Sequence, residues 1–186
     1  MDFNDKFEGG LSYDDFLAKY GNDEQQRRWA TVYEQVVLSP EQKQLLHSFS
    51  REMKVLVLAG TWCGDCVNQC PIFPRFAAEN ERIRIHFFDR DDEPDLAAEM
   101  QTCGAPRVPS VIFLSEDGYV CGRYGDRTLS KYRQMVASQL GAACPTGVVP
   151  PENSLLENVV QEWLNEFERI QWMLRTSGRL RQLHGD

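Results

Sequence analysis

The sequence predicts an α/β protein with a central mixed β-sheet of about four strands, flanked by helices. A continuous apolar run over 54–60 has the length of a strand buried on both faces of a sheet. A second strand is expected over 83–89 after a helical stretch, and two strands joined through a helix are parallel. Two further strands, over 110–114 and 119–124, enclose a turn that ends in Gly118 and are expected to form an antiparallel hairpin.

Helices are expected before, between and after these strands. Asn22 is a suitable N-cap for a helix with apolar residues at 3.6-residue spacing, although the Val- and Tyr-rich stretch 31–38 leaves a short edge strand as the alternative. Ser39 and Gln42 form the capping box of a second helix, whose apolar face we expect to extend to Met53. The remaining helices before the C-terminal part are expected over about 64–80, 93–102 and 129–140.

The C-terminal part carries a long amphipathic helix. Ser154 and Glu157 form its capping box, and its apolar stripe consists of Leu156, Val160, Trp163, Phe167, Ile170 and Leu174. Such a stripe has to be buried, and we expect it to pack on the N-terminal helices of the same chain; a homodimer or partner interface is the alternative. The predicted organisation is an N-terminal helical extension (1–50), a domain (51–141), a proline-rich linker (142–151) and a C-terminal amphipathic helix (152–186).

Charge and hydropathy exclude several classes of partner. The 186 residues carry 20 Lys and Arg against 28 Asp and Glu, a net charge of -8, which repels nucleic acid and anionic lipid. We therefore expect neither nucleic acid nor a membrane as partner, and no apolar run approaches the roughly 20 residues that span a bilayer. The acidic N-terminus lacks the basic start and apolar segment of a secretory signal, so a cytoplasmic location is expected.

Three of the six cysteines lie close together, as Cys63, Cys66 and Cys70. Without a secretory signal, this pattern favours reactive or metal-binding thiols over a disulfide framework. Cys63 follows the first strand and opens a helix, where unpaired backbone N–H groups favour the thiolate and lower the pKa. We predict that Cys63 is the nucleophile of a thiol–disulfide exchange and that Cys66, one turn further on, is the resolving thiol.

The run from Trp62 to Cys66, Trp-Cys-Gly-Asp-Cys, resembles the active site of the thioredoxin superfamily, and of bacterial thioredoxin-like proteins with this motif in particular. Pro71 matches the proline that kinks the active-site helix of that family. Val108 and Pro109, at the start of a strand, match its cis-proline segment. The resemblance covers roughly residues 51–141 and implies a thioredoxin fold in which both helical extensions are additions.

The resemblance also implies an activity. The chain would be a protein-disulfide oxidoreductase that acts on disulfide-containing proteins and regains electrons from a thioredoxin-reductase-like flavoprotein or a small thiol. It would need neither a metal nor an organic cofactor. Val108 and Pro109 would hold the substrate backbone while Trp62 shields one side of the site. The substrate-binding residues expected on this basis are Trp62, Gly64, Asp65, Arg107, Val108 and Pro109.

The chain departs from thioredoxin at two positions that bear on the chemistry. The buried acid that assists the second cysteine of the family would lie at Val57, so the proton of Cys66 has to pass to water or to another group. Asp65 replaces the usual proline, and its charge opposes the helix dipole at Cys63. We therefore expect a less depressed pKa than in a strong oxidant, which favours a reductant. Arg107, two residues before Pro109, would either attract anionic substrates or be a solvated surface charge.

The other cysteines leave alternatives open. Cys70 is either a small buried helix residue or an extra redox thiol that forms an alternative disulfide with Cys66. Cys63, Cys66 and Cys70 also match the last three ligands of a bacterial ferredoxin run, so a metal or cluster site, with Cys103 as a possible fourth ligand, is a further hypothesis. Cys121 is expected in the core. Cys103 and Cys144 are expected to be incidental surface or packing thiols, with a regulatory pair as the alternative. Finally, the fold could serve as a binding platform whose C-terminal helix recruits a partner.

Overall fold

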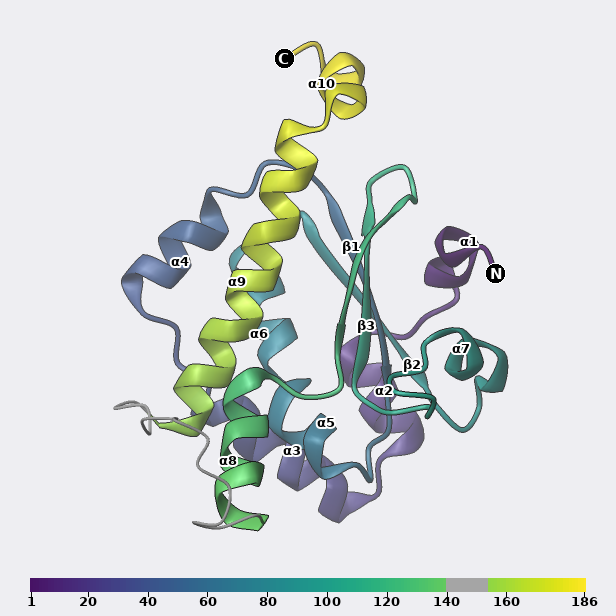
Figure 1. Cartoon of the computed structure of the whole chain (residues 1–186), viewed down its shortest axis with the longest axis vertical. Coiled ribbons are helices and arrows are strands. Elements are labelled where there is room, and N and C mark those ends of the chain that lie inside the picture. Colours follow the sequence, from purple (N-terminus) through teal and green to yellow (C-terminus); the bar gives the residue numbers. More distant parts are fainter. Residues whose placement is uncertain (140–153) are drawn as a thin grey trace.

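The structure, a computed structural model, describes residues 1–139 and 154–186. Its centre is a four-stranded sheet with the order β2-β1-β3-β4 (Figure 1). The strands are β1 (Met53–Ala59), β2 (Ile83–Asp89), β3 (Ser110–Ser115) and β4 (Val120–Gly125). β1 pairs in parallel with β2, whereas β3 is antiparallel to both β1 and β4. The predicted mixed sheet is thereby confirmed.

Helices precede, connect and follow the strands. Those before β1 are α1 (Phe3–Glu8), α2 (Tyr13–Tyr20), α3 (Asp23–Gln35) and α4 (Pro40–His47). Those between the strands are α5 (Gly64–Gln69), α6 (Ile72–Glu79) and α7 (Pro94–Glu99). Those after β4 are α8 (Leu129–Gln139), α9 (Leu155–Thr176) and α10 (Gly178–His184).

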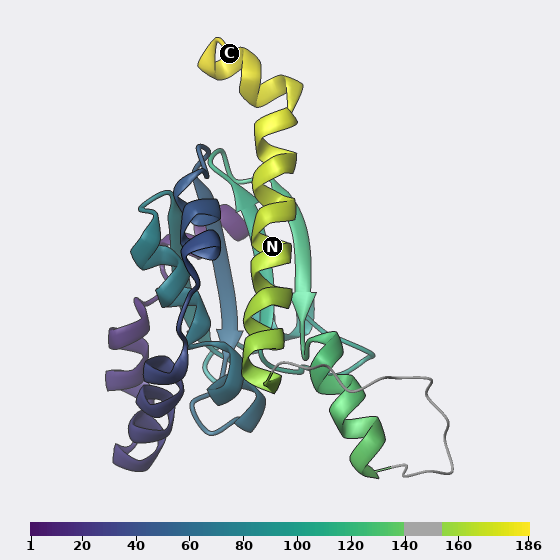
Figure 2. The same ribbon diagram turned by 90° about the vertical axis from the view of Figure 1, so that its left-hand side faces the viewer.

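The two faces of the sheet have different covers. Alternation along the strands places Phe87 and Phe113 on one face, where the aromatic rings of α2 and α9 contact them. The opposite face carries Lys54 and His86, and there α1 packs: Phe7 stacks on the His86 ring at 4.2 Å between centroids. Figure 2 shows the long helix α9 running along the sheet.

Helix α9 is part of the hydrophobic core. Trp163 packs edge-on against Phe73 of α6 and Tyr124 of β4, and Phe167 contacts Phe73 and Phe113. The expectation that the stripe packs on the N-terminal helices holds for α4, which lies beside α9. The aromatic rings of the stripe also contact α6, β3 and β4, which the sequence did not indicate. Of the stripe, Val160, Trp163, Phe167, Ile170 and Leu174 are buried within this chain, and Leu156 is partly buried.

Three predicted helix boundaries need correction. The helix capped by Ser39 ends at His47, and Met53 opens β1 instead; the Asn80 side chain donates to the carbonyls of residues 46 and 49 after the helix end. The helix expected over 64–80 is divided into α5 and α6 at Pro71, which has no N–H to continue the helix. The helix expected over 152–186 is divided at Ser177, whose hydroxyl caps α10.

The helix predicted after Asn22 is present in the structure. The segment capped by Asn22 is helical through Gln35, with a full capping box, so the helix prediction is confirmed over the edge strand. The predicted linker over 142–151 lies outside the described residues. Within the described ranges, no helix is long and apolar enough to span a membrane.

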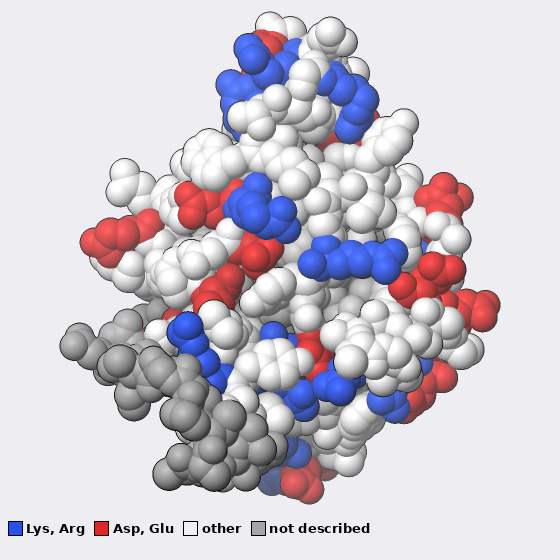
Figure 3. All heavy atoms as spheres, in the orientation of Figure 1, with Lys and Arg blue, Asp and Glu red and all other residues white. Residues whose placement is uncertain are grey.

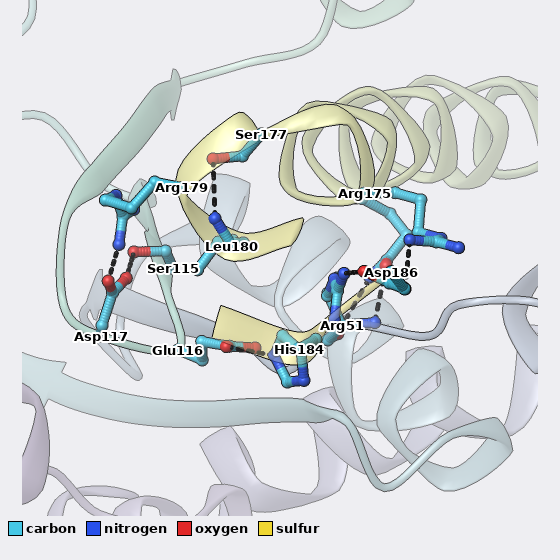
Figure 4. Close-up of polar contacts among 11 residues, drawn as sticks. Arg51, Ser115, Glu116, Asp117, Arg175, Ser177, Arg179, Leu180, His184 and Asp186 are labelled. Atoms are coloured by element: carbon cyan, nitrogen blue, oxygen red, sulfur yellow. Dashed lines mark hydrogen bonds and ion pairs between the residues drawn. The ribbon is translucent and has the colours of Figure 1, made fainter. Parts of the chain in front are cut away.

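Ion pairs attach α10 to the end of the sheet that lies away from the cysteines (Figure 4). The Asp186 carboxylate accepts from Arg51, before β1, and from Arg175 of α9, both at 2.5 Å. On the other side, Arg179 pairs with Asp117 and His184 with Glu116, both in the turn between β3 and β4. The C-terminal segment is thus tied to two connections of the sheet.

The burial of α9 predicts a contrast between two tryptophans of the same helix. Trp163→Ala should lower the free energy of unfolding by about 3–5 kcal/mol, because Trp163 is 0% exposed and its removal leaves a cavity under the helix. Trp172→Ala, at a position that is 47% exposed, is the matched control and should cost about 0.5 kcal/mol or less. Urea denaturation measures both, and equal losses would contradict the placement of α9.

Candidate active site

Cys63 lies where β1 gives way to α5. The strand ends at Ala59, the Cys63 N–H donates to the Gly60 carbonyl at 3.0 Å, and Cys63 then occupies the N-cap of α5. Its side chain is partly exposed and makes no capping hydrogen bond. The first turn of α5 therefore presents its backbone N–H groups to a thiol that solvent can reach.

The three clustered thiols form a line from the surface into the core. Cys66 and Cys70 are both 0% exposed, and all three cysteines are free thiols. Cys63 and Cys70 both influence the pKa of the Cys66 thiol, which lies between them on the chain. Within the described part of the chain, no group of three or more His, Cys, Asp or Glu side chains has the arrangement of a metal site.

Protonation of these thiols differs from the sequence-based expectation. The hydrogen bond with Cys66, followed by burial, raises the pKa of Cys63, and the backbone N–H groups of Cys66 and Asp65 oppose this without overcoming it. Burial likewise raises the pKa of Cys66. The predicted lowering at Cys63 is therefore wrong in sign, because contacts within the fold outweigh the helix end.

A second segment closes over the Cys63 thiol. The peptide bond between Val108 and Pro109 is cis, and both residues are buried. The Val108 carbonyl accepts a hydrogen bond from the Cys63 Sγ at 3.4 Å. Gly125, at the end of β4, has φ +132°, and a Cβ there would lie 2.4 Å from the Pro109 carbonyl oxygen, so only glycine fits against this segment.

The other sequence-predicted site residues lie in different surroundings. Trp62 is 43% exposed beside Cys63, and the Arg90 guanidinium lies 4.3 Å from the centre of its ring. Gly64 faces open space, so packing does not require a glycine there. Arg107 is directed to Asp126, at 3.0 Å, and its side chain stays 41% exposed.

The charge of Asp65 is balanced inside the protein. Its carboxylate pairs with Arg127 at 2.6 Å, and Arg127 also pairs with Asp126 at 3.2 Å. The sequence-based argument that a free Asp65 charge opposes the helix dipole therefore needs this correction. Figure 3 shows basic and acidic side chains intermixed over the described part of one face, so the net charge of -8 does not gather there as one acidic field.

Sequence reasoning missed Asp126, Arg127 and Tyr132, all of which lie after β4. A topological signal for the first two was available. β4 is antiparallel to β3 and β3 to β1, so β4 runs in the direction of β1 and ends at the same edge of the sheet. Polar residues that directly follow the last strand are thereby placed beside the residues that follow β1.

The N-terminal helices hold the turn that carries Cys63, which the sequence did not indicate either. The buried Trp29 of α3 donates through its Nε1 to the Thr61 carbonyl at 3.0 Å. The Thr61 hydroxyl donates to the Tyr20 carbonyl at the end of α2, also at 3.0 Å. Two hydrogen bonds from the N-terminal part of the chain thus fix the residue that precedes Trp62.

The remaining cysteines lie apart from the cluster. Cys103 is exposed, and Cys121 is partly buried on the edge strand β4, where burial raises its pKa and its Sγ donates to the Tyr119 carbonyl. Cys144 lies outside the described residues.

Comparisons with known proteins bear on the fold. A thioredoxin family model matches residues 10–139, beginning well before the residue 51 that the sequence motifs indicated. Among solved structures, a Pseudomonas aeruginosa protein of unknown function is similar over 91% of this chain and 96% of its own, with TM-score 0.72 and 16% identity. An HIV epitope scaffold is similar over 91% of this chain and 99% of its own, with TM-score 0.69 and 19% identity.

These matches reach into both terminal helical parts, because a coverage of 91% leaves no room for either to be missing. The thioredoxin of Fasciola hepatica is 22% identical, with TM-score 0.36, over 52% of this chain and 88% of its own. The comparison with curated proteins found no match.

The raised pKa of Cys63 predicts how its reactivity depends on pH. Alkylation by iodoacetamide should be slow at pH 7 and should continue to accelerate above about pH 8.5, the ordinary range for a thiol, because the thiolate is the reacting form. Mass spectrometry of the Cys63 peptide measures the rate, with the exposed Cys103 as reference in the same sample. A rate that levels off near pH 6 would contradict the prediction.

Proposed function

This chain belongs to the thioredoxin family, and we propose that it is a thiol–disulfide oxidoreductase that reduces protein disulfides through Cys63 and Cys66. One observation carries the proposal. A partly exposed thiol at the N-cap of α5 lies between a buried thiol of the same helix and the Val108 carbonyl, 3.4 Å away. This arrangement supports Cys63 as the nucleophile, Cys66 as the resolving thiol and the Val108 segment as the binding site for substrate backbone.

The exchange proceeds in two displacements. The Cys63 thiolate attacks one sulfur of the substrate disulfide, a bond forms between the two sulfurs, and the other substrate sulfur leaves as a thiolate that takes a proton from water. The Cys66 thiol then passes its proton to water, and the Cys66 thiolate attacks the Cys63 sulfur. The enzyme disulfide forms, the second substrate sulfur leaves, and the substrate has gained two electrons and two protons.

The direction of electron transfer between this protein and its substrate follows from the pKa values of the two thiols. A low thiolate pKa stabilises the reduced form of a dithiol and makes the enzyme an oxidant. Here the pKa of both Cys63 and Cys66 is raised, which removes that stabilisation and favours electron donation to the substrate. Electrons return, in this proposal, from a thioredoxin-reductase-like flavoprotein or a small thiol.

Cys70 is proposed as a buried hydrogen-bond partner of Cys66 in preference to a third redox thiol. The Cys70 N–H donates to the Cys66 carbonyl at 2.8 Å, so the two residues are successive neighbours on a helix face. Their Cβ atoms are then about 5–6 Å apart, whereas a disulfide needs about 3.5–4.5 Å. An alternative disulfide with Cys66 therefore requires this helical turn to open.

Reduction of insulin disulfides with dithiothreitol as electron source tests the function. The native protein should accelerate the reaction, and Cys63→Ser should abolish the acceleration, because no other partly exposed thiol lies beside Cys66 in the described residues. Cys103→Ser, which alters an exposed cysteine outside the cluster, is the matched control and should retain the native rate. Acceleration that survives Cys63→Ser would refute the proposed nucleophile.

The geometry of Cys70 predicts which disulfide forms on oxidation. Peptide mapping of the oxidised protein should find Cys63 joined to Cys66, with Cys70 still a thiol, because the helix keeps Cys66 and Cys70 too far apart. Cys70→Ala should leave this disulfide in place. A dominant disulfide between Cys66 and Cys70 would contradict the assignment.

A further inference from the structure

The buried carboxylate of Asp126 binds three side chains at the edge of the dithiol. Asp126 directly follows β4 and is 2% exposed. Its Oδ2 accepts from Arg107 at 3.0 Å and from Arg127 at 3.2 Å, and its Oδ1 accepts from the Tyr132 hydroxyl. Burial acts to raise the pKa of Asp126, but the hydrogen bonds from Tyr132 and Arg107 outweigh it and lower the pKa, so the group is a carboxylate at neutral pH.

The two arginines connect Asp126 to two different segments beside the Cys63 thiol. Arg107 directly precedes Val108, whose carbonyl accepts from Cys63 at 3.4 Å. Arg127 reaches in the other direction, to Asp65 at 2.6 Å, in the first turn of α5 between the two active cysteines. One carboxylate is therefore connected through two guanidinium groups to both walls of the site.

The backbone of Asp126 adds a second link to α5. Its carbonyl accepts from the side-chain amide of Gln69 at 3.0 Å, and Gln69 is itself 2% exposed in the last turn of that helix. The loop after β4 is thus bound to α5 through both the backbone and the side chain of Asp126.

We propose that Asp126 is a positioning residue for the exchange reaction: by binding Arg107 and Arg127 together, it fixes the segment before Pro109 relative to the first turn of α5. The segment would then present the disulfide of a bound peptide in line with the Cys63 sulfur. This inference rests on the proposed function, because it concerns how a protein substrate is oriented at that same site.

The role is one of geometry, since Asp126 does not contact a thiol. The pKa of Cys63 responds to Cys66, to burial and to the neighbouring backbone N–H groups. A small reagent that meets Cys63 without binding the segment should therefore be indifferent to Asp126. The reaction with a peptide disulfide should depend on Asp126, because that segment has to align the peptide.

Single-turnover exchange in a Cys66→Ser background separates these two cases. The peptide substrate carries a thiopyridyl group on its cysteine, and the small substrate is dithiodipyridine; each transfers its sulfur to Cys63 and releases thiopyridone, which is measured by absorbance. Asp126→Asn should slow the peptide reaction about tenfold and leave the dithiodipyridine rate within about twofold, as expected for a misaligned substrate.

Two further variants keep this test decisive. Arg127→Gln, made together with Asp65→Asn so that no unpaired carboxylate is left beside Cys63, removes the link to α5 and should give the same peptide-selective loss. Asp117→Asn, which breaks an ion pair with Arg179 at the opposite end of the sheet, is the matched control and should leave both rates unchanged. Equal losses with both substrates, or no loss with the peptide in Asp126→Asn and in the double variant, would overturn the inference.

The single-turnover exchange requires only Cys63, so its rates can be measured whether or not the native protein reduces insulin catalytically. A native protein that fails to accelerate insulin reduction would refute the proposed function, while the ratio of the peptide rate to the dithiodipyridine rate would still report on Asp126. Conversely, insulin reduction by the native protein with equal ratios in all variants would leave the function standing and remove the positioning role.

Discussion

The side-chain amide of Gln69 forms hydrogen bonds through both its oxygen and its nitrogen where α5, α9 and the loop after β4 meet. Its Oε1 accepts from the Trp163 indole at 3.0 Å, and its Nε2 donates to the carbonyls of Asp126 and Asp65, at 3.0 and 3.2 Å. A buried amide left without partners costs about 1–3 kcal/mol, so these three segments hold one another in place. Helix α9 therefore does more than cover the sheet, because its buried tryptophan also positions α5, which begins at Cys63 and carries Cys66.

The turn before Cys63 is held from the opposite side by the N-terminal helices. Thr61 is bound through its carbonyl by Trp29 and through its hydroxyl by Tyr20. These helices belong to the part of the chain that the thioredoxin family model matches, whereas α9 lies outside it. The cysteine turn thus depends on segments from both ends of the chain, and each of them contributes a tryptophan whose indole N–H is bound to the site.

The sequence predicted those features that depend on local pattern. The apolar run before Gly60 identified a strand buried on both faces, and the position of Cys63 and Cys66 after it placed the two thiols at the start of a helix. The sign of the Cys63 pKa shift and the partner of Asp65 could not be predicted in this way. Both depend on groups brought together by folding: Arg127 is distant in sequence from Asp65, and the distance closes only because β4 ends at the same edge of the sheet as β1.

The balance of effects at Cys63 explains why local reasoning gave the wrong sign. A helix N-terminus stabilises a negative group by about 0.3–1 kcal/mol, and one pKa unit corresponds to about 1.4 kcal/mol, so the helix end alone lowers a thiol pKa by less than about one unit. The contact with Cys66 and, after it, burial act in the opposite direction and are larger. The contact with Cys66 and burial therefore keep the Cys63 thiol protonated at rest. A dithiol that is not stabilised as a thiolate gives up its electrons more readily, which connects the packing over the site to a reducing role.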